Sequence, residues 1–214
     1  MITLAMDTST SQGTVAVLND DQLVASATFG RDGLFDAITR LNPGPFDRLV
    51  VGVGPGSFTG IRAGIAAAKG LALPRAVPIC AVSSFDGLAL TALPQLPDDC
   101  RQVCVVSDAR RGELYYARYD RLGQPVVECR IGTVETLAGE LCEPTWFISA
   151  EIDRYAARLR SIGLVCGMPV FPSAAILGRL GRGQTRSLPL EPIYLRELDY
   201  RQLPSQPKPT GGGR

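Results

Sequence analysis

Histidine is absent from this 214-residue chain. Its absence excludes the Ser-His-Asp and Cys-His arrangements of nucleophilic catalysis, His-ligated zinc, and the usual general base at neutral pH. The chain also lacks an apolar run of the roughly 20 residues that a membrane-spanning helix needs. No basic region precedes the first apolar segment, so we expect neither a membrane anchor nor a signal peptide.

Cysteine is present but is not arranged for metal binding. Of six cysteines only Cys100 and Cys104 lie close together, whereas an all-cysteine zinc site would need a second pair. We interpret the cysteines as small core residues in a reducing compartment rather than as a disulfide framework. The cytoplasm is therefore the expected location.

Neither sign of charge predominates, since the net charge is only +1. Residues 1–99 carry 6 basic and 9 acidic groups (net −3), and residues 100–214 carry 16 and 12 (net +4). A protein that grips nucleic acid by itself should show a basic stripe, and no run qualifies. Solvated arginines on helix surfaces are the favoured interpretation over direct RNA contact.

The hydrophobic pattern is that of a globular α/β protein, with 45% hydrophobic residues. In the first half, alternation and turn residues predict three strands, then helices and strands in turn. The expected strands are 2–6, 14–18, 22–29, 48–53 and 77–81, and the expected helices are 33–41, 61–73 and 83–93.

The second half repeats this order after a Pro-rich boundary at residues 94–99. An apolar strand again ends at an aspartate, Asp108 matching Asp7, and a polar turn with a glycine again leads into a hairpin. The expected strands of the second half are 102–107, 113–119, 125–131 and 145–149, and its expected helices are 134–141 and 154–162. Two such lobes resemble the actin-like superfamily, which implies two ribonuclease H-like lobes with mixed sheets. The first lobe should span 1–98, the second and smaller lobe 99–200, and a disordered Pro- and Gly-rich tail 201–214.

The two aspartates suggest a nucleotide site between the lobes. If each faced the cleft, Asp7 with the neighbouring Thr8 and Asp108 would hold Mg²⁺ and the phosphates of ATP or ADP. The structural alternative is that both aspartates cap turns through backbone amides. The residues alone leave both interpretations open.

A glycine-rich loop at residues 54–60 lies between an expected buried strand and a helix. Such loops accept anions at the helix N-terminus, but a tight strand-to-helix turn with Ser57 or Thr59 as the N-cap needs much the same residues. In the helix that follows, Gly60, Gly64 and Ala68 recur every fourth residue and leave one face bare. That face suits packing on the chain's own sheet or a helix of another subunit.

Several segments together resemble one family. They are MDTST (6–10), GVGPGSFTGIR (52–62), AVSS (81–84), SDARRGELYY (107–116) and EPIYLR (191–196). The chain is similar to the TsaB family across residues 1 to about 196.

The resemblance implies a non-catalytic subunit in the formation of threonylcarbamoyladenosine on tRNA. TsaB proteins bind the catalytic subunit TsaD through helices of the N-terminal lobe, and a TsaE-like ATPase joins them. TsaD holds its metal with histidines, which this chain lacks. The implied site is a partner interface at Gly60, Arg62, Ala63, Gly64, Ala67 and Ala68, with no catalytic or metal-binding residues and no required cofactor.

The resemblance also implies contact with tRNA only through the complex, and a homodimer where TsaD is absent. One departure is the segment 30–47, where family members carry a longer first helix with a histidine. Two other hypotheses stay open: a stand-alone nucleotide-dependent phosphotransferase or ATPase, and a peptidase. The peptidase is the weaker of the two, because no histidine or Ser-Lys signature supports it.

Overall fold

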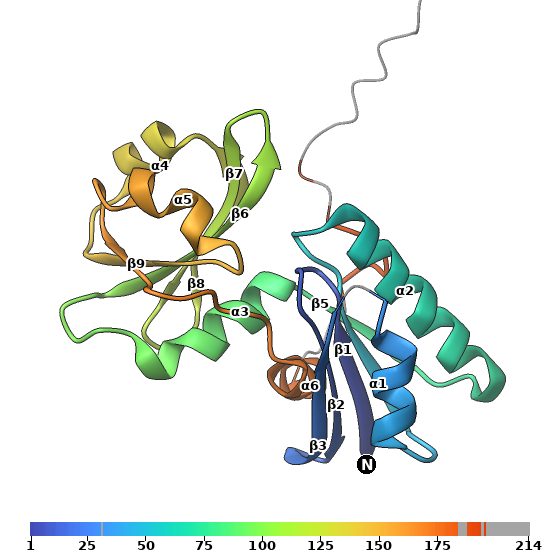
Figure 1. Ribbon diagram of the computed structural model, residues 1–214. Coiled ribbons are helices and arrows are strands. Elements are labelled where there is room, and N and C mark those ends of the chain that lie inside the picture. Colours follow the sequence, from blue (N-terminus) through green and yellow to red (C-terminus); the bar gives the residue numbers. More distant parts are fainter. Residues whose placement is uncertain (31, 184–187, 194, 196–214) are drawn as a thin grey trace, which may run out of the picture.

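The structure is a computed structural model that describes residues 1–30, 32–183, 188–193 and 195. Two lobes lie side by side, each built around a five-stranded mixed sheet (Figure 1). The expected two-lobed α/β architecture is confirmed.

The two sheets share one topology. The first has the order β3-β2-β1-β4-β5 and the second the order β10-β9-β6-β7-β8. In each sheet the first strand pairs antiparallel with a hairpin on one side and parallel with later strands on the other. The strands of the first sheet are β1 (Ile2–Asp7), β2 (Gly13–Asn19), β3 (Gln22–Phe29), β4 (Arg48–Gly52) and β5 (Ile79–Val82). Those of the second are β6 (Gln102–Arg110), β7 (Glu113–Asp120), β8 (Pro125–Gly132), β9 (Thr145–Ile148) and β10 (Leu164–Val165).

Six α-helices are described, and five of them match predicted segments to within a few residues. They are α1 (Leu34–Leu41), α2 (Phe58–Ala72), α3 (Ser84–Ala92), α4 (Val134–Glu140) and α5 (Ile152–Leu159). Short 3₁₀ turns, η1 (Leu73–Arg75) and η2 (Leu93–Gln95), extend α2 and α3. Strand β10 and the sixth helix, α6 (Ala174–Gly183), were missed by the sequence analysis.

Alternation along β1 separates two cores on the two faces of the first sheet. Leu4 and Met6 are fully buried in a cluster that includes residues of α1 and α2. Ala5, which points to the opposite face, joins a cluster with residues of α6. A period of two residues is what a strand buried on both faces requires.

Two helices, α3 and α6, each pack against the sheet of the other lobe. Helix α3 follows the first sheet in sequence, yet its Phe85 and Leu88 pack in a core of the second sheet. Helix α6 follows the second sheet but contacts β1, β2 and β4 of the first, and it also contacts α3. The range 99–200 expected for the second lobe therefore includes a helix that packs on the first sheet, because the apolar face of α6 finds its complement there.

Hydrogen bonds connect the lobes where the chain crosses back to α6. The Thr14 hydroxyl donates to the carbonyl of Pro172 at 3.0 Å and accepts the backbone N–H of Ala174 at 3.1 Å. On the other side, the Tyr119 hydroxyl donates to Asp86 Oδ1 at 2.7 Å. A strand residue of each lobe is thus tied to the segment that crosses over from the other.

In the part of the chain that the structure describes, no helix combines the length and apolar character of a membrane span. The six cysteines are all free thiols, as expected, and Cys100, Cys104 and Cys166 are buried. The tail expected at 201–214 lies outside the described residues.

The exchanged packing of α6 predicts a large effect of a core substitution on stability. Leu177 is fully buried between α6 and the first sheet. We expect Leu177→Ala to lower the free energy of unfolding by about 2–5 kcal/mol, measured by urea unfolding. Leu73→Ala, at a residue that is 81% exposed, is the control and should change it by less than about 0.5 kcal/mol. Equal effects of the two variants would contradict this account of α6.

Candidate functional site

A cleft of about 990 Å³ lies between the lobes. The first lobe contributes the turn after β1, the glycine-rich loop and the start of α2, and the second contributes the end of β6 and the start of α5. Hydroxyl groups are frequent in its lining, which includes Thr8, Ser9, Thr10, Ser11, Ser57, Thr59, Ser84, Ser107 and Ser149. Thr8 and Asp108 line the cleft, as predicted for a site between the lobes.

Asp7, in contrast, does not face the cleft. It is 1% exposed, and its Oδ1 accepts the backbone N–H and the hydroxyl of Ser9 at 2.7 and 2.6 Å. Its Oδ2 accepts the hydroxyl of Ser84 at 2.6 Å, and Ser84 Oγ accepts the N–H of Gly54 at 3.0 Å. Burial raises the pKa of Asp7, and these hydrogen bonds oppose the rise. The carboxyl group thus joins the end of β1, the glycine-rich loop and the start of α3.

Asp108 occupies the matching place in the second lobe but is bonded differently. Its Oδ1 accepts the backbone N–H of Arg110 at 2.8 Å, and its Oδ2 lies 3.1 Å from Arg154 Nη1 and 3.5 Å from Arg110 Nη1. Both aspartates therefore cap turns through a backbone amide two residues on, as the structural alternative predicted.

The hydrogen bonds and ion pairs of the two aspartates decide whether they can bind the Mg²⁺ of a nucleotide. A cation held by the paired carboxylates needs free, solvent-facing oxygens. Asp7 offers none in this arrangement, since both of its oxygens already accept protein hydrogen bonds, and Asp108 is shared between two guanidinium groups. The donor set does not fit the ion. Among the described residues no group of three Cys, Asp or Glu side chains is placed for a metal either.

The glycines of the loop and of α2 make room for the turn after β1. A Cβ at Gly52 would overlap the carboxylate of Asp7, and one at Gly60 would overlap the carbonyl oxygen of Thr8. A Cβ at Gly56 or Gly64 would likewise overlap Ser9 or Thr8. The four glycines, spaced four residues apart, thus bring α2 against the turn of residues 7–9.

Hydrogen bonds hold this contact. The N–H of Ser57 donates to the carbonyl of Ser9 at 2.7 Å, and the hydroxyl of Thr8 donates to the carbonyl of Gly60 at 2.8 Å. Ser57 is the N-cap of α2, accepting the N–H of Gly60 at 3.3 Å. The tight strand-to-helix turn, one of the two predicted alternatives, is therefore present. We name the contact of residues 7–9 with the loop and α2 the glycine clasp.

The predicted partner-interface residues divide between the interior and the surface. Gly64, Ala67 and Ala68 are buried in this chain, and Gly60 is half-buried against Thr8. The bare stripe of α2 thus packs internally. Arg62 and Ala63 are exposed on the outer face of the same helix.

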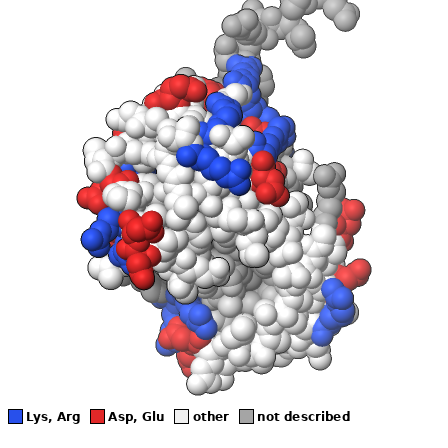
Figure 2. Space-filling view, turned by 60° about the vertical axis from the view of Figure 1, so that its left-hand side comes forward, with Lys and Arg blue, Asp and Glu red and all other residues white. Residues whose placement is uncertain are grey.

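The outer face of α2 carries apolar groups. Phe58 is 53% exposed, with the guanidinium of Arg62 5.0 Å from its ring centre, and Leu73 at the far end is 81% exposed. On α1, which covers the same face of the first sheet, Phe35 is 59% exposed. On the face that Figure 2 shows, which turns the left-hand side of Figure 1 forward and not the side of α2, charged side chains lie in separate groups with uncharged areas between them. We name Phe35, Phe58, Arg62, Ala63 and Leu73 the outer helix face.

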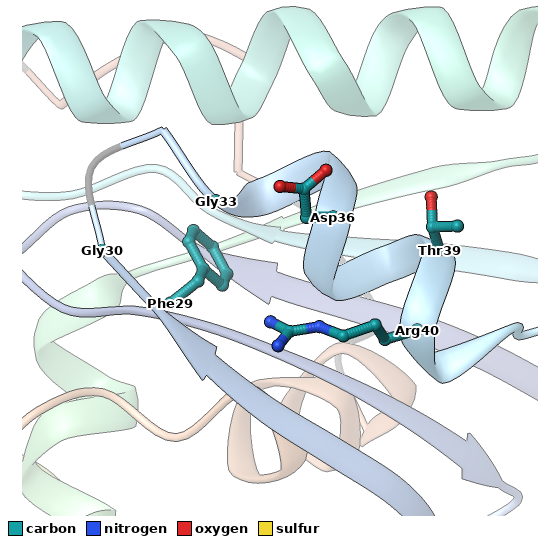
Figure 3. A pocket seen from close by; sticks show the side chains of 6 residues that line it. All are labelled: Phe29, Gly30, Gly33, Asp36, Thr39 and Arg40. Atoms are coloured by element: carbon teal, nitrogen blue, oxygen red, sulfur yellow. The ribbon is translucent and has the colours of Figure 1, made fainter.

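A shallower hollow of about 450 Å³ lies beside α1 (Figure 3). The side chain of Arg40 extends along α1 toward the ring of Phe29, and Asp36 points away from it. In the described residues of segment 30–47, where we expected no long first helix, the structure has the short α1.

Ser84 is the site residue that the sequence analysis missed. It is 1% exposed and bonds both Asp7 and Gly54, which are 77 and 30 residues away along the chain. Its position after β5, at the start of α3, could have predicted that it lies near Asp7, because the carboxyl ends of parallel strands meet at one edge of a sheet.

Comparisons with known proteins agree with this geometry. The family model of TsaD, tRNA N6-adenosine threonylcarbamoyltransferase, matches residues 37–149, more than half of the chain. An uncharacterized protein of Mycobacterium tuberculosis is 30% identical over 94% of both chains. TsaB of Escherichia coli is 35% identical over 55% of this chain and 54% of its own length, and TsaB of Haemophilus influenzae is 28% identical over 95% and 97%. The solved structure of YeaZ from Pseudomonas aeruginosa superposes with a TM-score of 0.74 at 24% identity, covering 91% of this chain and 99% of that one.

The fold and these matches define a class, the TsaD-related two-lobed α/β proteins. Within that class the chain belongs to the TsaB family.

The glycine clasp predicts opposite effects of two similar substitutions in α2. Glycine to alanine normally stabilises a helix by about 1 kcal/mol. We expect Gly70→Ala to stabilise the protein, because nothing lies within 4 Å of the added Cβ. Gly60→Ala should instead destabilise it by about 1–3 kcal/mol, because the Cβ would meet the backbone of Thr8. Urea unfolding measures both, and stabilisation by Gly60→Ala would contradict the clasp.

The buried carboxyl group of Asp7 predicts a pH dependence. Its folded-state pKa is raised above the ordinary value, so its contribution to stability is fully present at low pH and is lost as pH rises through the folded pKa. As the pH rises from the ordinary pKa of aspartate to the raised pKa of Asp7, the free energy of unfolding of the wild type should fall relative to that of Asp7→Asn. Above the raised pKa the difference should level off. A difference that grows with pH would show that the ionised form is favoured in the folded state.

Proposed function

We propose that this chain is the non-catalytic partner subunit of a threonylcarbamoyl transferase complex that forms threonylcarbamoyladenosine in tRNA. The relatives named tRNA threonylcarbamoyladenosine biosynthesis protein TsaB support the process. The outer helix face carries the finer part of the proposal, the binding and positioning of a TsaD-like catalytic subunit.

The outer helix face has the composition of a protein interface. Aromatic side chains and arginine are enriched at interfaces, whereas lysine is depleted, and Lys69 is the exposed lysine of α2 between Arg62 and Leu73. Phe35, Phe58 and Leu73 would each remove a large apolar surface from water on docking, and small residues such as Ala63 would let a partner helix approach closely. Arg62, held over the Phe58 ring, adds a donor at the centre of the face.

Two features support a role without catalysis. The chain has no histidine to act as a base or as a ligand for a transferase metal. The carboxyl group of Asp7 accepts hydrogen bonds from Ser9 and Ser84, so it is not free to act on a substrate. In this proposal the chain requires no cofactor and works in the cytoplasm. A TsaE-like ATPase joins the complex, and the chain forms a homodimer where TsaD is absent.

A stand-alone nucleotide-dependent phosphotransferase or ATPase is the second candidate, and the hydroxyl-lined cleft favours it. Binding of ATP with Mg²⁺ that is measured by calorimetry and abolished by Asp108→Asn would support this candidate. It would count against a purely positioning role.

The outer helix face can be tested by a charge placed at Ala63, an exposed residue that also lines the cleft. Ala63→Arg should weaken the complex with the cognate TsaD-like subunit at least tenfold, about 1.4 kcal/mol, because a bulky charge would be buried on docking. Ala157→Arg, at an exposed position of α5 on the other lobe, is the matched control and should leave the affinity unchanged. Titration calorimetry and size exclusion measure both.

The cellular readout is the threonylcarbamoyladenosine content of bulk tRNA. Depletion of the protein should lower it, the control variant should restore it, and Ala63→Arg should not. Unchanged modified nucleoside after depletion, or no complex between the wild-type chain and the TsaD-like subunit, would overturn the proposal.

A further inference from the structure

The hairpin between β6 and β7 presents two consecutive arginines at the rim of the cleft. Arg110, Arg111 and Gly112 all have left-handed backbone, with φ of 66°, 56° and 82°. Arg110 pairs with Glu113 across the hairpin, which leaves Arg111 and Gly112 as the two-residue turn. Both arginines line the cleft.

Arginine is an unusual choice for this backbone. A two-residue turn with positive φ at both central positions favours Asn-Gly or Asp-Gly, because a larger side chain is strained there. The Asp108 carboxylate helps to hold Arg110 by accepting its backbone N–H at 2.8 Å. Strained non-glycine residues persist where the side chain serves a purpose that a better turn former would not.

The charges around the hairpin tip leave the arginines available to a ligand. Arg110 Nη1 and Arg154 Nη1 share the one carboxylate of Asp108, at 3.5 and 3.1 Å. The side chains of Arg110 and Arg154 are 82% and 57% exposed, and Arg111 is also exposed. No ion pair of Arg111 is found among the described residues. The guanidinium groups of Arg110 and Arg154 therefore share the carboxylate of Asp108 at one rim of the cleft, which Arg111 also lines. Glu151 lies near Arg154, and Glu113 follows the turn.

We propose that Arg110 and Arg111 contact phosphate groups of the RNA strand on which the complex acts. The inference rests on the proposed function, and it adds a direct contact where the sequence suggested that tRNA is reached only through the complex. The planar guanidinium fork matches a phosphate with two parallel hydrogen bonds. Such contacts position an RNA backbone without reading its sequence.

The exposure of the tip favours a polymer over a free nucleotide. A small ligand is bound by enclosing most of its surface. Arg110 and Arg111 instead stand on a projecting hairpin with their side chains in solvent, where a passing strand can reach two neighbouring groups. The carboxylate of Asp108, which also lines the cleft, would repel a phosphate placed beside it.

The test uses the full chain in complex with its TsaD-like subunit and an unmodified tRNA transcript. Fluorescence anisotropy at several salt concentrations gives the affinity and its salt dependence. The double variant R110Q/R111Q should bind tRNA roughly tenfold more weakly at about 0.1 M salt, and its plot of log affinity against log salt should be shallower by about 1.5. The affinity of the two subunits for each other should not change.

Three controls separate charge from structure. R110K/R111K keeps the charges without the guanidinium fork, so it should keep the salt dependence of the wild type but restore only part of the affinity. R101Q removes an exposed arginine at the opposite end of β6 and should have no effect. R111N suits the left-handed backbone, so it should unfold at a higher temperature than the wild type while still weakening tRNA binding.

The outcomes distinguish this inference from the proposed function. If the complex forms and R110Q/R111Q binds tRNA with unchanged affinity and salt dependence, the RNA contact is overturned and the proposed function stands. If R110Q/R111Q loses affinity for ATP but not for tRNA, the arginines serve a free nucleotide and the inference is again overturned. If no complex forms, both fall.

Discussion

The glycine clasp is the interaction on which the rest of the arrangement depends. The turn of residues 7–9 can reach the end of β4, the glycine-rich loop and α2 only because Gly52, Gly56, Gly60 and Gly64 carry no side chains there. Once the turn is seated, Asp7 is sealed from water and reaches Ser84 at the start of α3. Three segments that are distant in the sequence are thereby placed relative to each other, and the outer face of α2 is directed away from the sheet.

The two lobes form one molecule through the exchange of α3 and α6, each of which covers the sheet of the other half. This exchange sets the cleft between the turn after β1 and the hairpin tip at Arg110. The proposed partner face lies on the far side of the first sheet from α6, and the arginine pair lies on the second lobe. A docked catalytic subunit and an RNA strand would thus meet different lobes of the chain, although Phe58 and Ala63 of the partner face also line the cleft.

Much of the fold follows from local pattern. The five strands of the first sheet and three helices were predicted because period-two alternation, buried apolar runs and turn residues are local properties. Helix α6 was missed because its apolar face is completed by strands of the first sheet and by α3, which lie far from it in the sequence. The site was predicted less well: Asp108 and Thr8 do line the cleft, but Asp7 does not, since its partners Ser9 and Ser84 are brought together by folding.

Without any structure, the sequence determined the duplicated strand order, the absence of histidine chemistry and the family, because each is carried by residue identity and spacing. Tertiary structure decided what the glycines are for. A glycine every fourth residue is equally suited to a phosphate, a partner helix or the chain's own backbone, since it only removes a side chain. Which of these fills the space depends on the position of the turn at residues 7–9, and that position is set by hydrogen bonds between residues up to 77 positions apart.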